Sequence, residues 1–120
     1  MIKIDEELLD FISHAAKNTH PNEFAAFLRE EKEIISEVIF SPFSIFGRNS
    51  STISHFSLPI DVSIVGTVHS HPSANGSPSR EDLNFFLRYG KVHIIICYPY
   101  NRNDLFFYSR EGENLAYELV

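Results

Sequence analysis

The chain has 120 residues, of which 43% are hydrophobic and 22% are charged, and its formal net charge is -6. A chain of this length and composition predicts one globular domain spanning residues 1–120. The acidic balance excludes nucleic acid and anionic membranes as expected partners, because both are bound by basic surfaces. The single cysteine, Cys97, excludes an intramolecular disulfide and a zinc cluster built from several thiolates.

The beginning of the chain does not have the pattern of a signal peptide. Asp5, Glu6 and Glu7 make it acidic at the point where a signal peptide becomes apolar. No segment approaches the roughly 18 uninterrupted apolar residues that a membrane-spanning helix requires. The lack of a second cysteine is also typical of a reducing compartment. We therefore expect a soluble, cytoplasmic protein.

The first expected element is a helix over residues 5–18. Asp5 can cap its start, and the helical pattern ends before His20 and Pro21. The apolar residues of this segment recur at helical spacing: Leu8, Leu9, Ile12, Ala15 and Ala16.

The next segment has the pattern of a β-hairpin followed by a loop. Strands are expected over residues 23–28 and 34–40, on either side of a charged turn at residues 29–32. Residues 41–51 have the turn-forming composition of a loop. This loop nevertheless carries large apolar side chains, so we expect it to contact a partner through Phe43, Ile45 and Phe46.

The remainder of the chain predicts one more helix among several strands. The helix is expected over residues 79–89, where Leu83, Phe86 and Leu87 recur at helical spacing. Gly90 follows at a position suited to the left-handed residue that closes a helix. The strands are expected over residues 52–57, 63–70, 92–98, 104–109 and 114–119.

Two histidines and an aspartate have the spacing of a metal site. His69 and His71 follow an apolar strand, and side chains two residues apart on a strand point to the same face. Pro72 ends the strand, and the Gly- and Ser-containing segment 73–78 lets the chain turn back, so that the next helix can bring in Asp82. Hydrolytic zinc sites use three such protein ligands and leave a fourth position open for water.

Each of these features also has an ordinary explanation when it is taken alone. Two histidines in an extended segment are more often surface or hydrogen-bonded residues than ligands. Ser79 and Asp82 have the spacing of a capping box, in which Ser79 caps the helix and the acid reaches back to its N–H. The combination of a two-histidine strand with a carboxylate at the following helix start is what favours a zinc site.

Hydrolysis at such a site requires a general base, and Glu23 is the best candidate. It directly precedes the apolar run 24–28, where desolvation would raise the pKa of a carboxyl group toward the working pH. The alternative is that Glu23 begins a strand at the sheet edge and faces water.

The other residues capable of this chemistry have simpler interpretations. Cys97 ends an apolar strand and is predicted to be a packed residue and not a nucleophile. The remaining histidines are predicted to be structural or surface residues, and His20 is the least certain because it lies close to Glu23; they are His14, His20, His55 and His93.

These residues together resemble the signature of the JAMM (MPN+) zinc metalloproteases. The signature is an upstream Glu, then H-[ST]-H-P, then a Ser and, three positions later, an Asp; it is matched by Glu23, His69-Ser70-His71-Pro72, Ser79 and Asp82. The resemblance covers nearly the whole chain and is to small, stand-alone prokaryotic members similar to archaeal deubiquitinase-like proteases. It implies that His69, His71 and Asp82 hold one Zn²⁺, that Glu23 transfers the proton, and that Ser79 stabilises the oxyanion.

The resemblance also implies a fold and a reaction. The fold is a compact α/β domain of the cytidine-deaminase-like (MPN/JAMM) type, with a curved, mostly antiparallel sheet flanked by helices. The reaction is hydrolysis of the bond after the C-terminal glycine of a ubiquitin-like modifier conjugated to lysine, with the substrate tail lying as an added strand beside the site. A chain this short has no room for the long insertions with which some relatives select one ubiquitin linkage. We therefore expect no strong selectivity among such linkages without a partner.

Two other functions remain open. One keeps the chemistry but has a ubiquitin-like sulphur-carrier protein as the substrate, from which a C-terminal amino acid is removed. The other is a non-catalytic MPN scaffold, which the complete set of ligands and the candidate base disfavour.

Overall fold

The computed structural model describes residues 1–40 and 63–120. In chain order the elements are β1 (Ile2–Ile4), α1 (Glu6–Thr19), β2 (Ala25–Glu31), β3 (Ile34–Ile39), β4 (Ile64–His71), α2 (Arg80–Phe86), β5 (Val92–Cys97), the short 3₁₀ helix η2 (Arg102–Asp104), β6 (Leu105–Ser109) and β7 (Tyr117–Leu119). The loop expected at 41–51, the strand expected at 52–57 and His55 lie outside the described residues.

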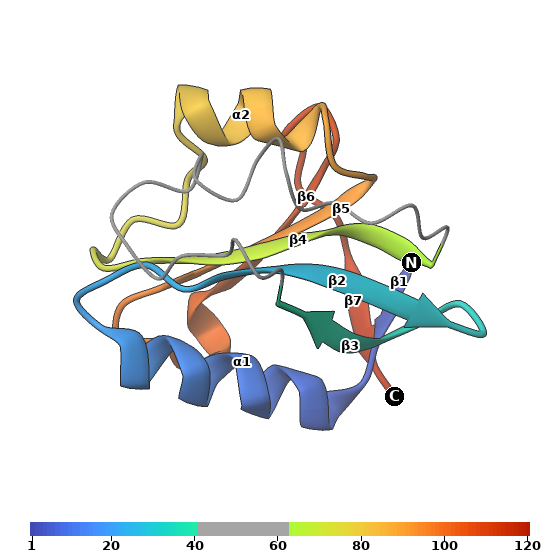
Figure 1. Cartoon of the computed structure of the whole chain (residues 1–120), viewed down its shortest axis with the longest axis horizontal. Coiled ribbons are helices and arrows are strands. Elements are labelled where there is room, and N and C mark those ends of the chain that lie inside the picture. Colours follow the sequence, from blue (N-terminus) through green and yellow to red (C-terminus); the bar gives the residue numbers. More distant parts are fainter. Residues whose placement is uncertain (41–62) are drawn as a thin grey trace.

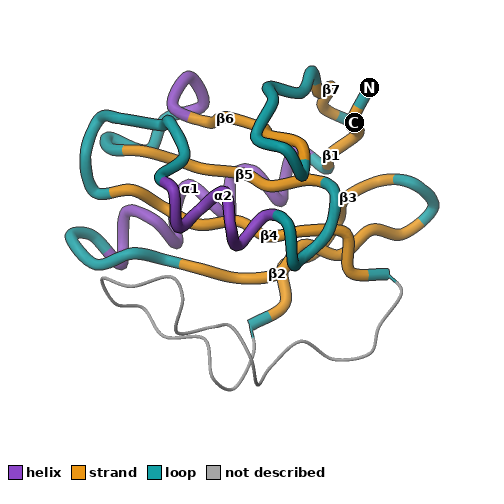
Figure 2. Tube along the Cα trace, turned by 90° about the horizontal axis from the view of Figure 1, so that it is seen from above, coloured by secondary structure: helices purple, strands orange, loops and turns teal. Residues whose placement is uncertain are grey.

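The described strands form one curved sheet in the order β6-β5-β4-β2-β3-β1-β7 (Figure 1, Figure 2). The pairs β2–β3, β2–β4 and β5–β6 are antiparallel, whereas β1–β3, β1–β7 and β4–β5 are parallel. The expected α/β domain is confirmed, and its sheet is mixed, with most of the paired residues in antiparallel pairs. A parallel pair requires a crossover connection, and α2 supplies one between β4 and β5.

Helices α1 and α2 cover opposite faces of the sheet (Figure 1). One core cluster joins α1 to the even-numbered Ala26 and Leu28 of β2 and to Phe24 just before it. The other core cluster joins α2 to the odd-numbered Ala25 and Phe27. This alternation follows from the two-residue period of a strand. A sheet buried on both faces also explains why its central strands are continuous apolar runs.

The predicted helices are present, with some changes at their ends. The side chain of Asp5 accepts a hydrogen bond from the N–H of Glu7 at 2.9 Å and caps α1 as expected. Helix α2 ends at Phe86, before the expected end at residue 89. Gly90 does adopt a positive φ of 108°, but it does so in the turn before β5, where a Cβ atom would overlap the carbonyl of Val65.

The two strands at the sheet edge beside the termini differ most from expectation. Strand β1 was not predicted, because three residues are too few to show an alternating pattern. Strand β7 is shorter than the expected strand at residues 114–119. They pair with each other, and β1 also pairs with β3. No helix in the described ranges is long and apolar enough to cross a lipid bilayer.

Candidate metal centre

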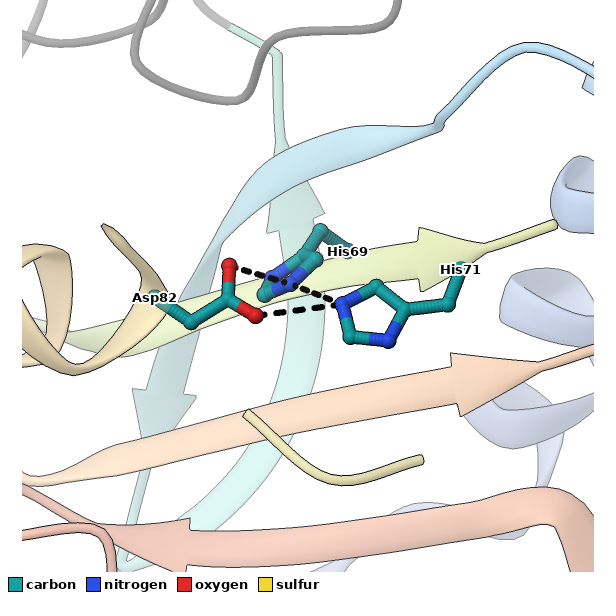
Figure 3. Close-up of side chains that lie close together, drawn as sticks. All are labelled: His69, His71 and Asp82. Carbon is teal, nitrogen blue, oxygen red and sulfur yellow. Dashed lines mark hydrogen bonds and ion pairs between the residues drawn. The ribbon is translucent and has the colours of Figure 1, made fainter. Parts of the chain in front are cut away.

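Three side chains converge at the end of β4 (Figure 3). His69 and His71 extend from the same face of this strand, and their Nε2 atoms lie 3.1 Å apart. Asp82 comes from the first turn of α2. Its Oδ1 atom lies 3.1 Å from His69 Nε2, and its Oδ2 atom lies 3.1 Å from His71 Nε2. The crossover from β4 to α2 therefore brings together all three residues that the sequence predicts as ligands.

The arrangement of these three residues fits a zinc ion. Within residues 1–40 and 63–120, they form the one group of His, Cys, Asp or Glu side chains whose ligand atoms all lie within 4.8 Å of one another. Ligand atoms arranged tetrahedrally around zinc lie roughly 3.3 Å apart, which is close to the separations seen here. Imidazole nitrogens and a carboxylate oxygen are ligands that zinc accepts readily. Three protein ligands also leave a fourth position for water.

The imidazole of His71 is oriented for metal binding by the loop that follows it. Its Nδ1 atom lies 2.9 Å from the carbonyl oxygen of Asn75, and because a carbonyl can only accept, Nδ1 must donate. A neutral imidazole with its proton on Nδ1 presents the lone pair of Nε2 to the site. The loop is itself held by the Tyr108 hydroxyl, which donates to the carbonyl of Gly76 at 2.6 Å. No residue pattern indicates the role of Asn75, because the contact uses a backbone carbonyl.

Asp82 is held in its ionised form. Burial raises the pKa of this carboxyl group, but hydrogen bonds with His69, His71 and the backbone of Ser79 outweigh burial and bring the pKa well below its usual range. For His71, burial lowers the pKa, but the hydrogen bonds with Asp82 and the Asn75 carbonyl outweigh burial and raise it. In the metal-free site the imidazole of His71 therefore keeps its second proton to a higher pH than usual, and that proton must be lost before a metal binds.

Glu23 lies just before β2, on the side of the metal centre. The pairing of β2 with β4 ends at Ala25 opposite His69, and Glu23 lies two residues before Ala25. The carboxyl group of Glu23 interacts electrostatically with His69, His71 and Asp82, so it lies beside the metal centre. Strand β2 lies between β3 and β4, and Glu23 is partly buried, so the alternative of an exposed position at the sheet edge is wrong.

The environment of Glu23 suits a general base. Burial raises the pKa of its carboxyl group, and although His69 and His71 oppose this, the carboxylates of Asp82 and Glu81 add to it. All three candidate ligands therefore act electrostatically on this carboxyl group. A raised pKa brings a carboxylate closer to the working pH of a proton-transfer group.

Ser79 is exposed and caps α2 through the predicted capping box. The N–H of Asp82 donates to Ser79 Oγ at 3.0 Å, and the N–H of Ser79 donates to Asp82 Oδ2 at 2.8 Å. The hydroxyl of Ser79 acts as an acceptor in this cap, so its proton is not used. Capping the helix and donating to an oxyanion are thus compatible roles for the same hydroxyl group.

The other residues considered in the sequence take structural or surface positions. Cys97 is buried in β5, and burial raises the pKa of its thiol, so it is unsuited to act as a nucleophile. His14 is exposed. His20 stacks on Tyr98 and is 2.7 Å from the hydroxyl of Tyr100. His93 is buried between Thr67 and the Gly90 carbonyl.

Comparison with known proteins identifies relatives along almost the whole chain. A family model described as prokaryotic homologs of the JAB domain matches residues 5–110. A probable metalloprotease of Haloferax volcanii is 33% identical over 123 residues, which cover 94% of this chain and 76% of the relative. A JAB1/MPN domain protein from Archaeoglobus fulgidus has 46% sequence identity and a TM-score of 0.81, with 98% of each chain covered.

A further similar structure is that of JAMM, a metalloprotease-like zinc site in the proteasome and signalosome. It has 42% sequence identity and a TM-score of 0.80, with 100% of this chain and 98% of that chain covered. The fold and the His-His-Asp centre define a JAMM-type zinc metalloprotease. The chain belongs to the family of prokaryotic homologs of the JAB domain, and its cofactor is Zn²⁺.

Proposed function

We propose that this metalloprotease is a cytoplasmic isopeptidase. Its substrate would be a ubiquitin-like modifier conjugated to lysine, cleaved after the C-terminal glycine of the modifier. The observation that carries the proposal is the convergence of His69, His71 and Asp82 beside the carboxyl group of Glu23, which supplies each group needed for amide hydrolysis. The likeness to a metalloprotease-like zinc site in the proteasome and signalosome supports a protein substrate.

The proposed ligands are His69, His71 and Asp82. A zinc ion held by these residues would supply Lewis acidity, which makes water a better nucleophile near neutral pH and polarises the scissile carbonyl. Asn75 keeps the imidazole of His71 oriented, and Ser79 keeps the carboxylate of Asp82 oriented through its backbone N–H. These partners hold the ligands ready before the metal arrives.

Glu23 is proposed as the acid/base group. As the oxygen of water attacks the carbonyl carbon, the Glu23 carboxylate takes a proton from that water. The protonated carboxyl then gives the proton to the lysine nitrogen as the C–N bond breaks, so the lysine leaves as a neutral amine. Its partly buried position and raised pKa favour both transfers.

Ser79 is proposed as the oxyanion donor. Its hydroxyl is exposed beside Asp82, and the proton of this hydroxyl is not used by the helix cap. A single donor to a developing oxyanion is worth about 3 kcal/mol of transition-state stabilisation.

A panel of substrates tests the proposal. The purified protein is incubated with a modifier–lysine isopeptide conjugate, a sulphur-carrier ubiquitin-like protein with a C-terminal extension, and unfolded casein. Rapid cleavage of the isopeptide conjugate after the terminal glycine is expected, with loss of turnover on chelation or in Glu23→Ala. Cleavage of the sulphur carrier alone would favour the processing function. Equal cleavage of casein, or no cleavage of any substrate by the zinc-loaded protein, would overturn the proposal.

A further inference from the structure

Ser70, between the two histidine ligands, makes two hydrogen bonds to the residue that follows Glu23. The N–H of Ser70 donates to the carbonyl oxygen of Phe24 at 2.9 Å. In return, the N–H of Phe24 donates to Ser70 Oγ at 2.8 Å. Both residues are completely buried. The backbone next to Glu23 is thus attached to the strand that carries the ligands.

One of these two bonds departs from the regular pattern of an antiparallel pair. Residues of a hydrogen-bonded pair normally exchange two bonds between their backbones. Phe24 and Ser70 lie next to the pair of Ala25 with His69 and are placed to exchange two such bonds. The N–H of Phe24, however, bonds to the side chain of Ser70. The hydroxyl of Ser70 therefore ends the β2–β4 pairing, and Glu23 is the first residue beyond it.

The side chain of Ser70 acts from the opposite face of the sheet. Alternate residues of a strand point to opposite faces, so Ser70 points away from the imidazoles of His69 and His71. Phe24, its partner, belongs to the core cluster under α1. Replacing the Ser70 side chain therefore leaves the ligand side chains themselves untouched.

The position of Glu23 depends on this backbone attachment. The carboxylate of Glu23 makes no hydrogen bond or ion pair with any described residue, so no side-chain contact of that kind fixes it. A slip of one residue in the pairing of β2 with β4 would move the side chain of Glu23 to the other face of the sheet. A residue that fixes the end of this pairing consequently fixes the side on which Glu23 lies.

We propose that Ser70 is a positioning residue for hydrolysis, whose hydroxyl bond to the Phe24 N–H holds Glu23 beside the metal centre. This inference rests on the proposed function, in which Glu23 transfers the proton. It assigns Ser70 no contact with substrate, zinc or the reacting atoms.

Three variants separate positioning from simple structural support. Ser70→Ala removes the hydroxyl, and Ser70→Thr retains it. Ser36→Ala is the matched control, because the Ser36 hydroxyl is buried on β3 without a hydrogen-bond partner in the described part of the chain. Zinc affinity, kcat and KM are measured for each variant with a substrate that the wild type cleaves, and again in the Glu23→Gln background.

Ser70→Ala is expected to bind zinc as the wild type does, with kcat lowered about 10- to 100-fold and KM within about twofold, as for a misplaced catalytic group. Ser70→Thr and Ser36→Ala are expected to keep wild-type kcat. In the Glu23→Gln background, Ser70→Ala should cause no further loss, because it acts through Glu23. Loss of zinc binding in Ser70→Ala, an unchanged kcat, or an equal further loss in the Glu23→Gln background would overturn the proposal.

A crystal structure of zinc-loaded Ser70→Ala provides a readout that does not depend on the substrate. The carboxylate of Glu23 is expected to move away from His71, with the three ligands in place. An unmoved Glu23 would overturn the positioning role even if the proposed substrate proved wrong. Conversely, a displaced Glu23 in a protein inactive on all conjugates would reject the proposed function alone.

Discussion

Ser79 and Asp82 hold each other through two hydrogen bonds at the start of α2. The N–H of Asp82 donates to Ser79 Oγ at 3.0 Å, and the N–H of Ser79 donates to Asp82 Oδ2 at 2.8 Å. The second bond uses the same carboxylate oxygen that lies 3.1 Å from His71 Nε2. One structural motif thus starts the helix, orients a metal ligand and places a hydroxyl beside the metal centre.

The capping and oxyanion roles of Ser79 can be separated by substitution. Ser79→Ala is expected to lower the free energy of unfolding by about 1 kcal/mol through loss of the cap. It should also lower kcat by roughly 10²-fold through loss of the oxyanion donor. Ser79→Gly also lacks the hydroxyl but is well tolerated at an N-cap, so it should keep most of the stability and not the activity. Urea unfolding and steady-state kinetics measure the two effects, and full activity in Ser79→Gly would rule out the oxyanion role.

Zinc binding is expected to weaken as the pH falls. The pKa of His71 is raised by its bonds to Asp82 and Asn75, which outweigh its burial, so its imidazole remains protonated to a higher pH than usual. A metal must displace that proton, and the apparent affinity should decrease progressively below the raised pKa. Competition titrations with a chelating dye between about pH 5 and 8 measure this dependence. A pH-independent affinity would show that His71 is not a ligand.

His93 is expected to make the fold sensitive to acid. Its Nε2 donates to the Gly90 carbonyl at 3.0 Å, and when the ring is neutral its Nδ1 accepts from the Thr67 hydroxyl at 2.7 Å. Burial lowers its pKa from 6.5 to about 4, although the hydrogen bond with the Gly90 carbonyl opposes this shift.

The direction of the acid effect follows from this lowered pKa. The unfolded chain binds a proton at His93 more readily than the native protein does, so stability is complete above about pH 6.5 and decreases as the pH falls toward about 4. The loss attributable to this residue is at most about 3 kcal/mol. Urea unfolding of the metal-free protein at several pH values measures it, and His93→Gln should show a flatter dependence. Parallel profiles for the two proteins would contradict the assignment.

The sequence predicted most of the site because its signals are local. The two-residue period of a strand places His69 and His71 on one face, and the capping spacing places Asp82 at the helix start. Glu23 could be identified only as an acid beside an apolar run, since its distance from His69 depends on the β2–β4 register. That register is a long-range property that no short pattern reveals.

Other features could not be predicted for comparable reasons. The Asn75 carbonyl orients His71 through the backbone, which has no residue-specific signal. Strand β1 has only three residues and exists through its partners at the sheet edge. The parallel pairing of β4 with β5, in contrast, was available from the strand–helix–strand order of that segment. The orientation of Ser70 could also be predicted, because a residue between two ligands on a strand points to the opposite face of the sheet.

The most direct test of the account compares zinc content and turnover in the wild type and Glu23→Gln. Both proteins are expected to bind one zinc ion per chain with similar affinity, because Glu23 is not a proposed ligand. The wild type should cleave the isopeptide conjugate, lose activity on chelation and regain it with zinc, whereas Glu23→Gln should be slower by at least about 10²-fold. Wild-type turnover by zinc-loaded Glu23→Gln, or by chelated wild type, would contradict a mechanism in which Glu23 works beside a zinc ion.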